Sequence, residues 1–101
     1  MTLFDENTLA GGTVAPICQR YGIQRLALFG SRLKGTARDD SDVDLLVEFA
    51  PGRLPGLLGL SAIELELSQA LGLKVDLRTA AELSRYFRDE VLHSAREVYA
   101  S

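Results

Sequence analysis

The stretch FGSRLKGTARDDSDVDLLVEF, residues 29–49, decides the fold because it joins two predicted strands. Residues 24–29 form an apolar run that is too short for a helix and ends at a Gly-Ser pair, which predicts a strand. Residues 42–49 form a second apolar run, and a strand is predicted there too. The polar residues between them, with one helical turn predicted at 31–34, connect the two strands.

Two carboxylates open the second strand. Side chains alternate along a strand, so Asp42 and Asp44 point to one face while Val43 points into the core. Two carboxylates held this close repel each other unless a cation lies between them. Oxygen ligands of this kind suit Mg²⁺ or Mn²⁺, which also take ligands from a substrate's phosphates. The pattern therefore predicts a site for a divalent cation and a phosphorylated substrate.

The rest of the chain predicts a small domain of the α/β (α+β) class. Its other elements are a helix at 13–20, a loop at 51–56, a helix at 57–71, a strand at 73–77 and a helix at 80–95. This order predicts a mixed three-stranded sheet packed with helices, in which strands 42–49 and 73–77 are parallel because a helix joins them. We expect a single domain over residues 1–101, with residues 1–12 loosely ordered.

Apolar side chains at helical spacing indicate the buried faces of the last two helices. In helix 57–71 they are Leu60, Ile63, Leu67, Ala70 and Leu71. In helix 80–95 they are Leu83, Phe87, Val91 and Leu92. Cys18 is predicted to be a small buried hydrophobic residue, and His93 to lie at the surface.

Composition and charge limit the classes of function. The 101 residues are 47% hydrophobic and 25% charged, as in an ordinary globular chain. The net charge of −3 does not favour direct binding of nucleic acid. A single cysteine excludes an internal disulfide and suits a reducing compartment, and no uninterrupted apolar stretch is long enough to span a bilayer. We therefore expect a cytoplasmic protein that does not associate with membranes.

Two further features complete the predicted site. Asp76, in the strand at 73–77, would bring a third carboxylate if it lies at the height of the other two. Three carboxylates suit two metal ions that flank a phosphoryl or nucleotidyl transfer. At the end of the first strand, Gly30 lets a phosphate approach the backbone, and the turn that begins at Ser31 offers free N–H groups beside the cationic Arg32.

The motif residues resemble the signature of the polymerase-β-like nucleotidyltransferase superfamily. The matching residues are Gly30-Ser31-Arg32, Gly35 and the run Ser41-Asp42-Val43-Asp44-Leu45-Leu46-Val47. The sequence is most similar to the minimal nucleotidyltransferase branch, the antitoxin subunit of HEPN/MNT toxin–antitoxin systems. The similarity extends over roughly residues 14–99 and includes Lys74-Val75-Asp76-Leu77.

The resemblance implies roles for individual residues. Gly30, Ser31 and Arg32 would bind the phosphates of the nucleotide. Asp42, Asp44 and Asp76 would be the catalytic carboxylates and metal ligands for two Mg²⁺ ions, with Asp76 activating the attacking hydroxyl. Lys34 stands where arginine is common in the family, which keeps the charge but loses bidentate geometry.

The resemblance also implies an activity, which is the transfer of AMP from ATP to a tyrosine of a cognate HEPN ribonuclease toxin. This chain has no room for an acceptor-binding domain, so a separate protein is expected to present the hydroxyl. Two alternatives remain open at this point. One is an antitoxin that acts by binding alone, and the other is a nucleotidyltransferase that modifies a small molecule.

Overall fold

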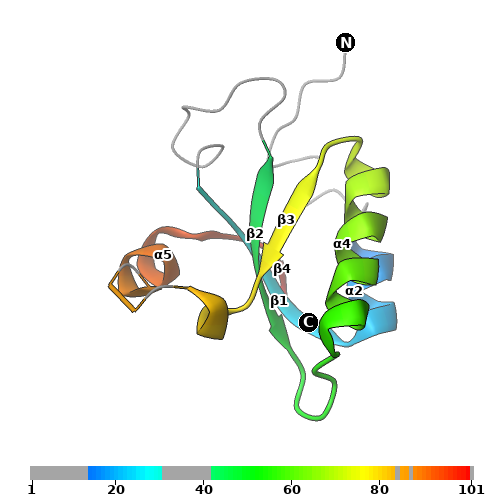
Figure 1. Cartoon of the computed structure of the whole chain (residues 1–101), viewed down its shortest axis with the longest axis horizontal. Coiled ribbons are helices and arrows are strands. Elements are labelled where there is room, and N and C mark those ends of the chain that lie inside the picture. The colour runs from blue at the N-terminus through cyan, green and yellow to red at the C-terminus, as the bar shows by residue number, and fades with distance from the viewer. Residues whose placement is uncertain (1–13, 31–41, 84, 87, 101) are drawn as a thin grey trace.

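The computed structural model describes residues 14–30, 42–83, 85–86 and 88–100, which form one sheet with helices on both of its faces (Figure 1). The helices are α2 (Ala15–Tyr21), α4 (Leu57–Leu71) and α5 (Arg88–Ser94), with a 3₁₀ turn η2 (Ala80–Glu82). The strands are β1 (Ile23–Phe29), β2 (Val43–Phe49), β3 (Val75–Arg78) and β4 (Arg96–Ala100). The turn predicted at 31–34 and residues 1–12, which were predicted to be loosely ordered, lie outside the described residues.

The sheet is mixed, and its strand order is β3-β2-β1-β4. β1 pairs antiparallel with both β2 and β4, whereas β2 and β3 are parallel. The parallel pair is connected through α4, as the usual crossover geometry requires. The predicted fold class and the predicted parallel pair are therefore confirmed.

Two predictions about the C-terminal part were wrong. The sheet has four strands instead of three, and the helix predicted at 80–95 is divided into η2 and α5. Leu83 has an extended backbone, which ends the first turn, and it is buried against the sheet. The chain then forms β4, where Val98 and Tyr99 favour a strand and the free edge of β1 offers hydrogen-bonding partners.

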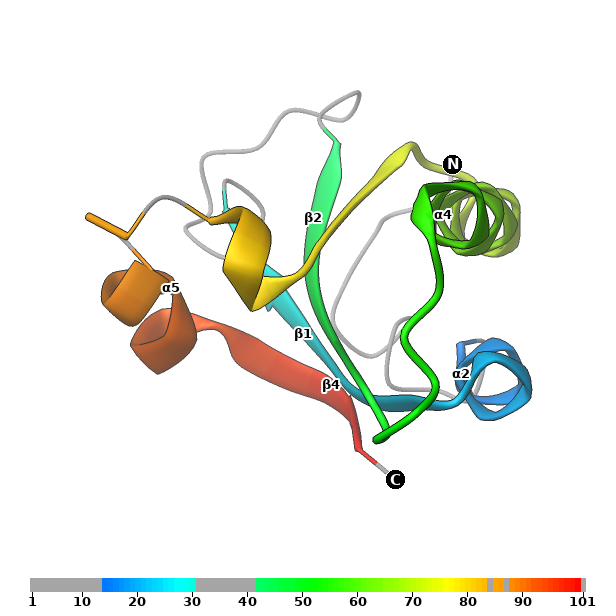
Figure 2. The same ribbon diagram turned by 60° about the horizontal axis from the view of Figure 1, so that its bottom comes forward.

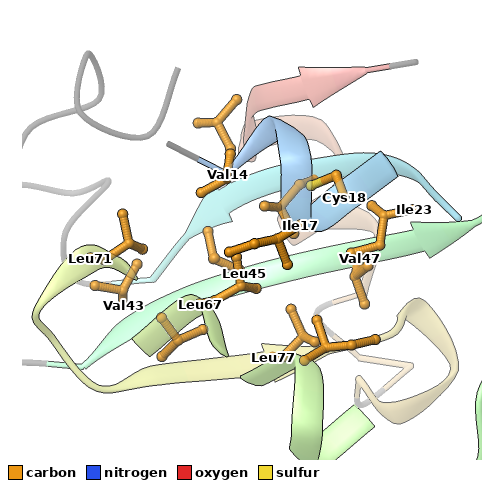
Figure 3. Close-up of a cluster of buried hydrophobic side chains, with 14 of the residues drawn as sticks. Val14, Ile17, Cys18, Ile23, Val43, Leu45, Val47, Leu67, Leu71 and Leu77 are labelled. Atoms are coloured by element: carbon orange, nitrogen blue, oxygen red, sulfur yellow. The ribbon is translucent and has the colours of Figure 1, made fainter. Parts of the chain in front are cut away.

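One face of the sheet is covered by α2 and α4 (Figure 2). Figure 3 shows the core that they enclose, in which Cys18, Val43 and Leu67 have no exposed surface. Alternating residues of the strands, such as Leu45 and Val75, contribute to the same cluster. Of the apolar set predicted for α4, Ala70 is the exception because it is exposed.

The other face is covered only in part, by η2 and α5. A small cluster of Ala27, Leu46 and Leu83 is buried there, with Val91 and Leu92 packed against it. Phe87, which was predicted to belong to this set, lies outside the described residues. The part of this face near the end of β1 carries polar side chains instead.

The edge strand β3 is protected by side chains of α4. Ser68 accepts a hydrogen bond from the backbone N–H of Val75 at 2.9 Å, and Glu64 accepts one from that of Leu77 at 2.8 Å. These contacts occupy backbone donors that an edge strand would otherwise offer to another chain. No helix in the part of the chain that the structure describes is long and apolar enough to cross a membrane.

Candidate active site

A row of three side chains crosses the partly covered face of the sheet. In the register of the strands, Phe29 of β1 lies opposite Asp44 of β2, and Asp44 lies opposite Asp76 of β3. Their neighbours along the strands, such as Val43 and Val75, point to the helix-covered core. The sheet therefore places Asp76 at the height of Asp44, although the two residues are far apart in sequence.

The surroundings of Asp44 penalise its negative charge. Burial raises the pKa of the Asp44 carboxyl above its ordinary value, and the nearby carboxylates of Asp76 and Asp42 raise it further. Arg78 opposes these effects. A cation bound between the carboxylates would relieve the same repulsion, so these surroundings suit a divalent ion.

Gly30 directly follows β1 and lies beside Asp44. Its backbone has φ +80°, a conformation that residues with a side chain rarely adopt. A Cβ atom at this position would overlap the Asp44 carboxylate and lie 2.9 Å from its Cγ atom. Glycine is therefore needed for two reasons, the backbone conformation and the space occupied by the carboxylate.

Two basic side chains lie beside the carboxylates of Asp76 and Asp42. Arg78 binds Asp76 in a bidentate manner, with Nε 3.1 Å from Oδ1 and Nη2 3.2 Å from Oδ2. Lys74 Nζ lies 3.9 Å from Oδ2 of Asp42, at the start of β2. Arg78 was missed by the sequence reasoning, although its position two residues after Asp76 in a strand places both side chains on one face.

The same face of the sheet contains a hollow of about 290 Å³, which we call the carboxylate hollow. Asp44, Asp76 and Phe29 line it together with Arg78 and with Glu82 and Leu83 of the segment that follows β3. Apolar side chains thus adjoin the carboxylates on the same face. The hollow thus combines four charged side chains with the apolar side chains of Phe29 and Leu83.

The donor set fits a divalent cation chemically. Asp42, Asp44 and Asp76 supply the hard oxygen ligands that Mg²⁺ prefers, and the raised pKa of Asp44 reflects the charge that a cation would neutralise. Within the described ranges, no group of three or more His, Cys, Asp or Glu side chains is arranged to hold a metal ion. The side chains of Asp42 and Asp76 instead engage Lys74 and Arg78.

The structure thus places most of the predicted site residues. Gly30, Asp44 and Asp76 are brought together at one end of the sheet, with Asp42 immediately before β2. Ser31 and Arg32, predicted to bind nucleotide, lie outside the described residues. The roles of all these residues in binding and catalysis stay predictions.

Fold and site together define a small α/β protein whose carboxylates suit a cation-dependent reaction of a phosphorylated substrate. Residues 14–98 match the model of the nucleotidyltransferase domain family, so the chain belongs to this family. The predicted class of enzyme, a nucleotidyltransferase, is confirmed by this match.

Relatives and solved structures agree with the family. The protein adenylyltransferase MntA of Thermococcus cleftensis is 39% identical over 92 residues, which are 91% of each protein. A solved structure described as a minimal nucleotidyltransferase is 38% identical, with a TM-score of 0.73, and covers 94% of this chain and 97% of that one.

A more distant similarity bears on the fold alone. One chain of a complex between the tri-AMPylated Shewanella oneidensis HEPN toxin and the MNT antitoxin matches with a TM-score of 0.68. The two chains are 17% identical, and the match covers 96% of this chain and 74% of the other.

Proposed function

We propose that the chain is an antitoxin that transfers AMP from ATP to a tyrosine hydroxyl of a cognate HEPN ribonuclease toxin, in the cytoplasm. The observation that carries the proposal is the register of Asp44 with Asp76 beside Gly30. The name of the Thermococcus relative supports AMP transfer to a protein. The Shewanella complex, one chain of which shares the fold of this chain, contains an AMPylated toxin, and this is the reason for proposing a toxin as the acceptor.

In this proposal, each site residue has a distinct task. Gly30, Ser31 and Arg32 would bind the phosphates of ATP, and Asp42, Asp44 and Asp76 would hold two Mg²⁺ ions. When bound, these ions supply the positive charge that stabilises the α-phosphate and the leaving pyrophosphate during transfer.

The transfer exchanges one phosphorus–oxygen bond for another. The acceptor oxygen forms a bond to the α-phosphorus of ATP, and the bond from that phosphorus to the pyrophosphate oxygen breaks. Asp76 accepts the proton of the acceptor hydroxyl and passes it to solvent. Arg78 holds Asp76 through two hydrogen bonds, which keeps this carboxylate oriented before the substrates bind.

The test uses ATP labelled at the α-phosphate and the protein encoded by the adjoining reading frame. We expect labelling of that partner in the presence of Mg²⁺, and none with the Asp42→Asn, Asp44→Asn double variant. Asp89→Asn is the control, because Asp89 is exposed on α5 and has no part in the proposed site. Equal labelling by the double variant would rule out the mechanism. Neutralisation of the toxin without labelling would favour an antitoxin that acts by binding alone.

A further inference from the structure

Three exposed leucines lie close together at the start of α4. One of them precedes the helix, and the other two are its first residues. Leu54, Leu57 and Leu58 are 74%, 83% and 88% exposed, and together we call them the leucine surface. An exposed leucine alone needs no explanation, but several within one short stretch form an apolar patch. Such patches commonly bind another molecule.

The leucine surface borders a second hollow, which we call the edge hollow because it lies beside the edge strand β3. This hollow has a volume of about 380 Å³, and α4 contributes Leu57, Leu60, Ser61 and Glu64 to its lining. The opposite wall contains Asp76, Arg78 and Glu82, which also line the carboxylate hollow. Asp76 therefore borders both hollows, and Leu57, which belongs to the leucine surface, lines the same hollow as Asp76.

The contacts of β3 limit what can bind in the edge hollow. The backbone N–H groups of Val75 and Leu77 already donate to Ser68 and Glu64 of α4. An extended segment added to this edge would have to break these hydrogen bonds. A helix or loop that binds through its side chains keeps them.

The charges of the edge hollow indicate the chemistry of its occupant. Its lining includes the carboxylates of Glu64, Asp76 and Glu82, against the single guanidinium of Arg78. The excess of negative charge favours a basic group. A fitting occupant therefore combines apolar side chains for the leucine surface with a basic residue for the hollow.

We propose that the leucine surface and the edge hollow form the docking surface for the acceptor protein. This protein binds through a helix or loop with apolar and basic side chains and thereby brings its hydroxyl to Asp76. The nucleotide binds on the other side of Asp76, in the carboxylate hollow. This inference rests on the proposed function, because that function requires a protein acceptor.

The test compares two substitutions of exposed leucines on the same helix. In the Leu57→Gln, Leu58→Gln variant, the leucine surface loses most of its apolar area. The matched control is Leu65→Gln, because Leu65 is also exposed on α4 but belongs neither to the leucine surface nor to the lining of the edge hollow. Calorimetry measures binding of the protein encoded by the adjoining reading frame and, separately, of a non-hydrolysable ATP analogue with Mg²⁺.

We expect the double variant to bind the partner about tenfold more weakly or worse, as for central interface residues, while the control stays within about twofold of the wild type. In the labelling assay, the KM for the partner should rise and kcat at saturation should change little. Binding of the ATP analogue should be unchanged, since neither leucine lines the carboxylate hollow. Higher salt should weaken binding of the partner to the wild type, because charges contribute.

The possible failures separate the two proposals. If the wild type labels the partner and the double variant binds it as tightly as the wild type does, the docking surface is wrong and the proposed function stands. If the wild type binds the partner without labelling it and the double variant does not bind, the proposed function fails and the docking surface stands. Loss of self-association with intact partner binding would assign the leucine surface to a second copy of the chain, against the proposal. If the double variant does not fold, Leu57→Gln alone gives the same comparison, because Leu57 lines the edge hollow.

Discussion

The two faces of the sheet differ in the side chains that the same strands place on them. The face under α2 and α4 carries a continuous apolar core, in which Val43 and Leu67 are completely buried. The opposite face has a small apolar cluster under η2 and α5, and beside it the row of Phe29, Asp44 and Asp76. The difference shows how one face can stabilise the fold while the other carries charges that are costly to bury.

The largest expected effect comes from removing core volume on the helix-covered face. Leu67→Ala should lower the free energy of unfolding by about 2–5 kcal/mol, because Leu67 is fully buried and a cavity remains. Leu83→Ala on the opposite face should cost roughly 2 kcal/mol or less, because its smaller cluster can relax around the change. Urea denaturation measures both values. Equal losses would show that the two faces stabilise the fold to the same extent.

An intermediate effect is expected where β1 ends beside the carboxylates. Gly30→Ala should destabilise the fold by more than the roughly 1–2 kcal/mol that a left-handed backbone costs an alanine, since its Cβ would also overlap the Asp44 carboxylate. It should lower partner labelling by about a hundredfold, as misplaced reacting groups can. Gly52→Ala is the matched control because Gly52 has a similar φ of +77° and no atom within 4 Å of the added Cβ.

The control should lose stability only through its backbone and keep its labelling activity. Denaturation and labelling assays on the two variants separate the effect of backbone conformation from that of the overlap. If the two variants lose the same stability and labelling activity, overlap with the Asp44 carboxylate does not contribute to the effect of Gly30→Ala.

The smallest expected effect is a gain in stability. Because the pKa of Asp44 is raised in the folded protein, ionisation of this group becomes a cost as the pH rises above the ordinary carboxyl value of about 3.9. Asp44→Asn should therefore raise the midpoint of thermal unfolding by a few degrees at pH 7 without divalent ions, on a scale of about 4–8 °C per kcal/mol. At pH 3, where the carboxyl of Asp44 is protonated and as uncharged as the amide of the Asp44→Asn variant, the gain should disappear.

Scanning calorimetry at the two pH values, with EDTA and then with Mg²⁺, checks this prediction. Asp89→Asn is the control and should give no gain, since a negative charge in the first turn of α5 is favourable. Mg²⁺ should stabilise the wild type more than Asp44→Asn. A lower midpoint for Asp44→Asn at pH 7 would contradict the inference that the charge of Asp44 destabilises the folded protein.

Local sequence patterns predicted the elements that surround the site. The apolar runs placed β1 and β2 within a residue of their observed bounds, and the predicted helix at 57–71 coincides with α4. The C-terminal part was harder to predict, because residues 80–95 have apolar residues at helical spacing although Leu83 is extended in the structure. Contact of Leu83 with the sheet overrides the local helical pattern, as tertiary contacts commonly do.

The sequence by itself determined the residue types of the site and the alternation that puts Asp44 and Asp76 on the face opposite Val43 and Val75. Only the tertiary structure decided that β3 lies beside β2 in the register that joins Asp44 to Asp76. It also decided that Arg78 engages Asp76 and that Leu57 of the leucine surface lines the same hollow as Asp76. The physical reason is that alternation follows from the geometry of a single strand. Register and edge pairing, by contrast, depend on contacts between segments far apart in the chain.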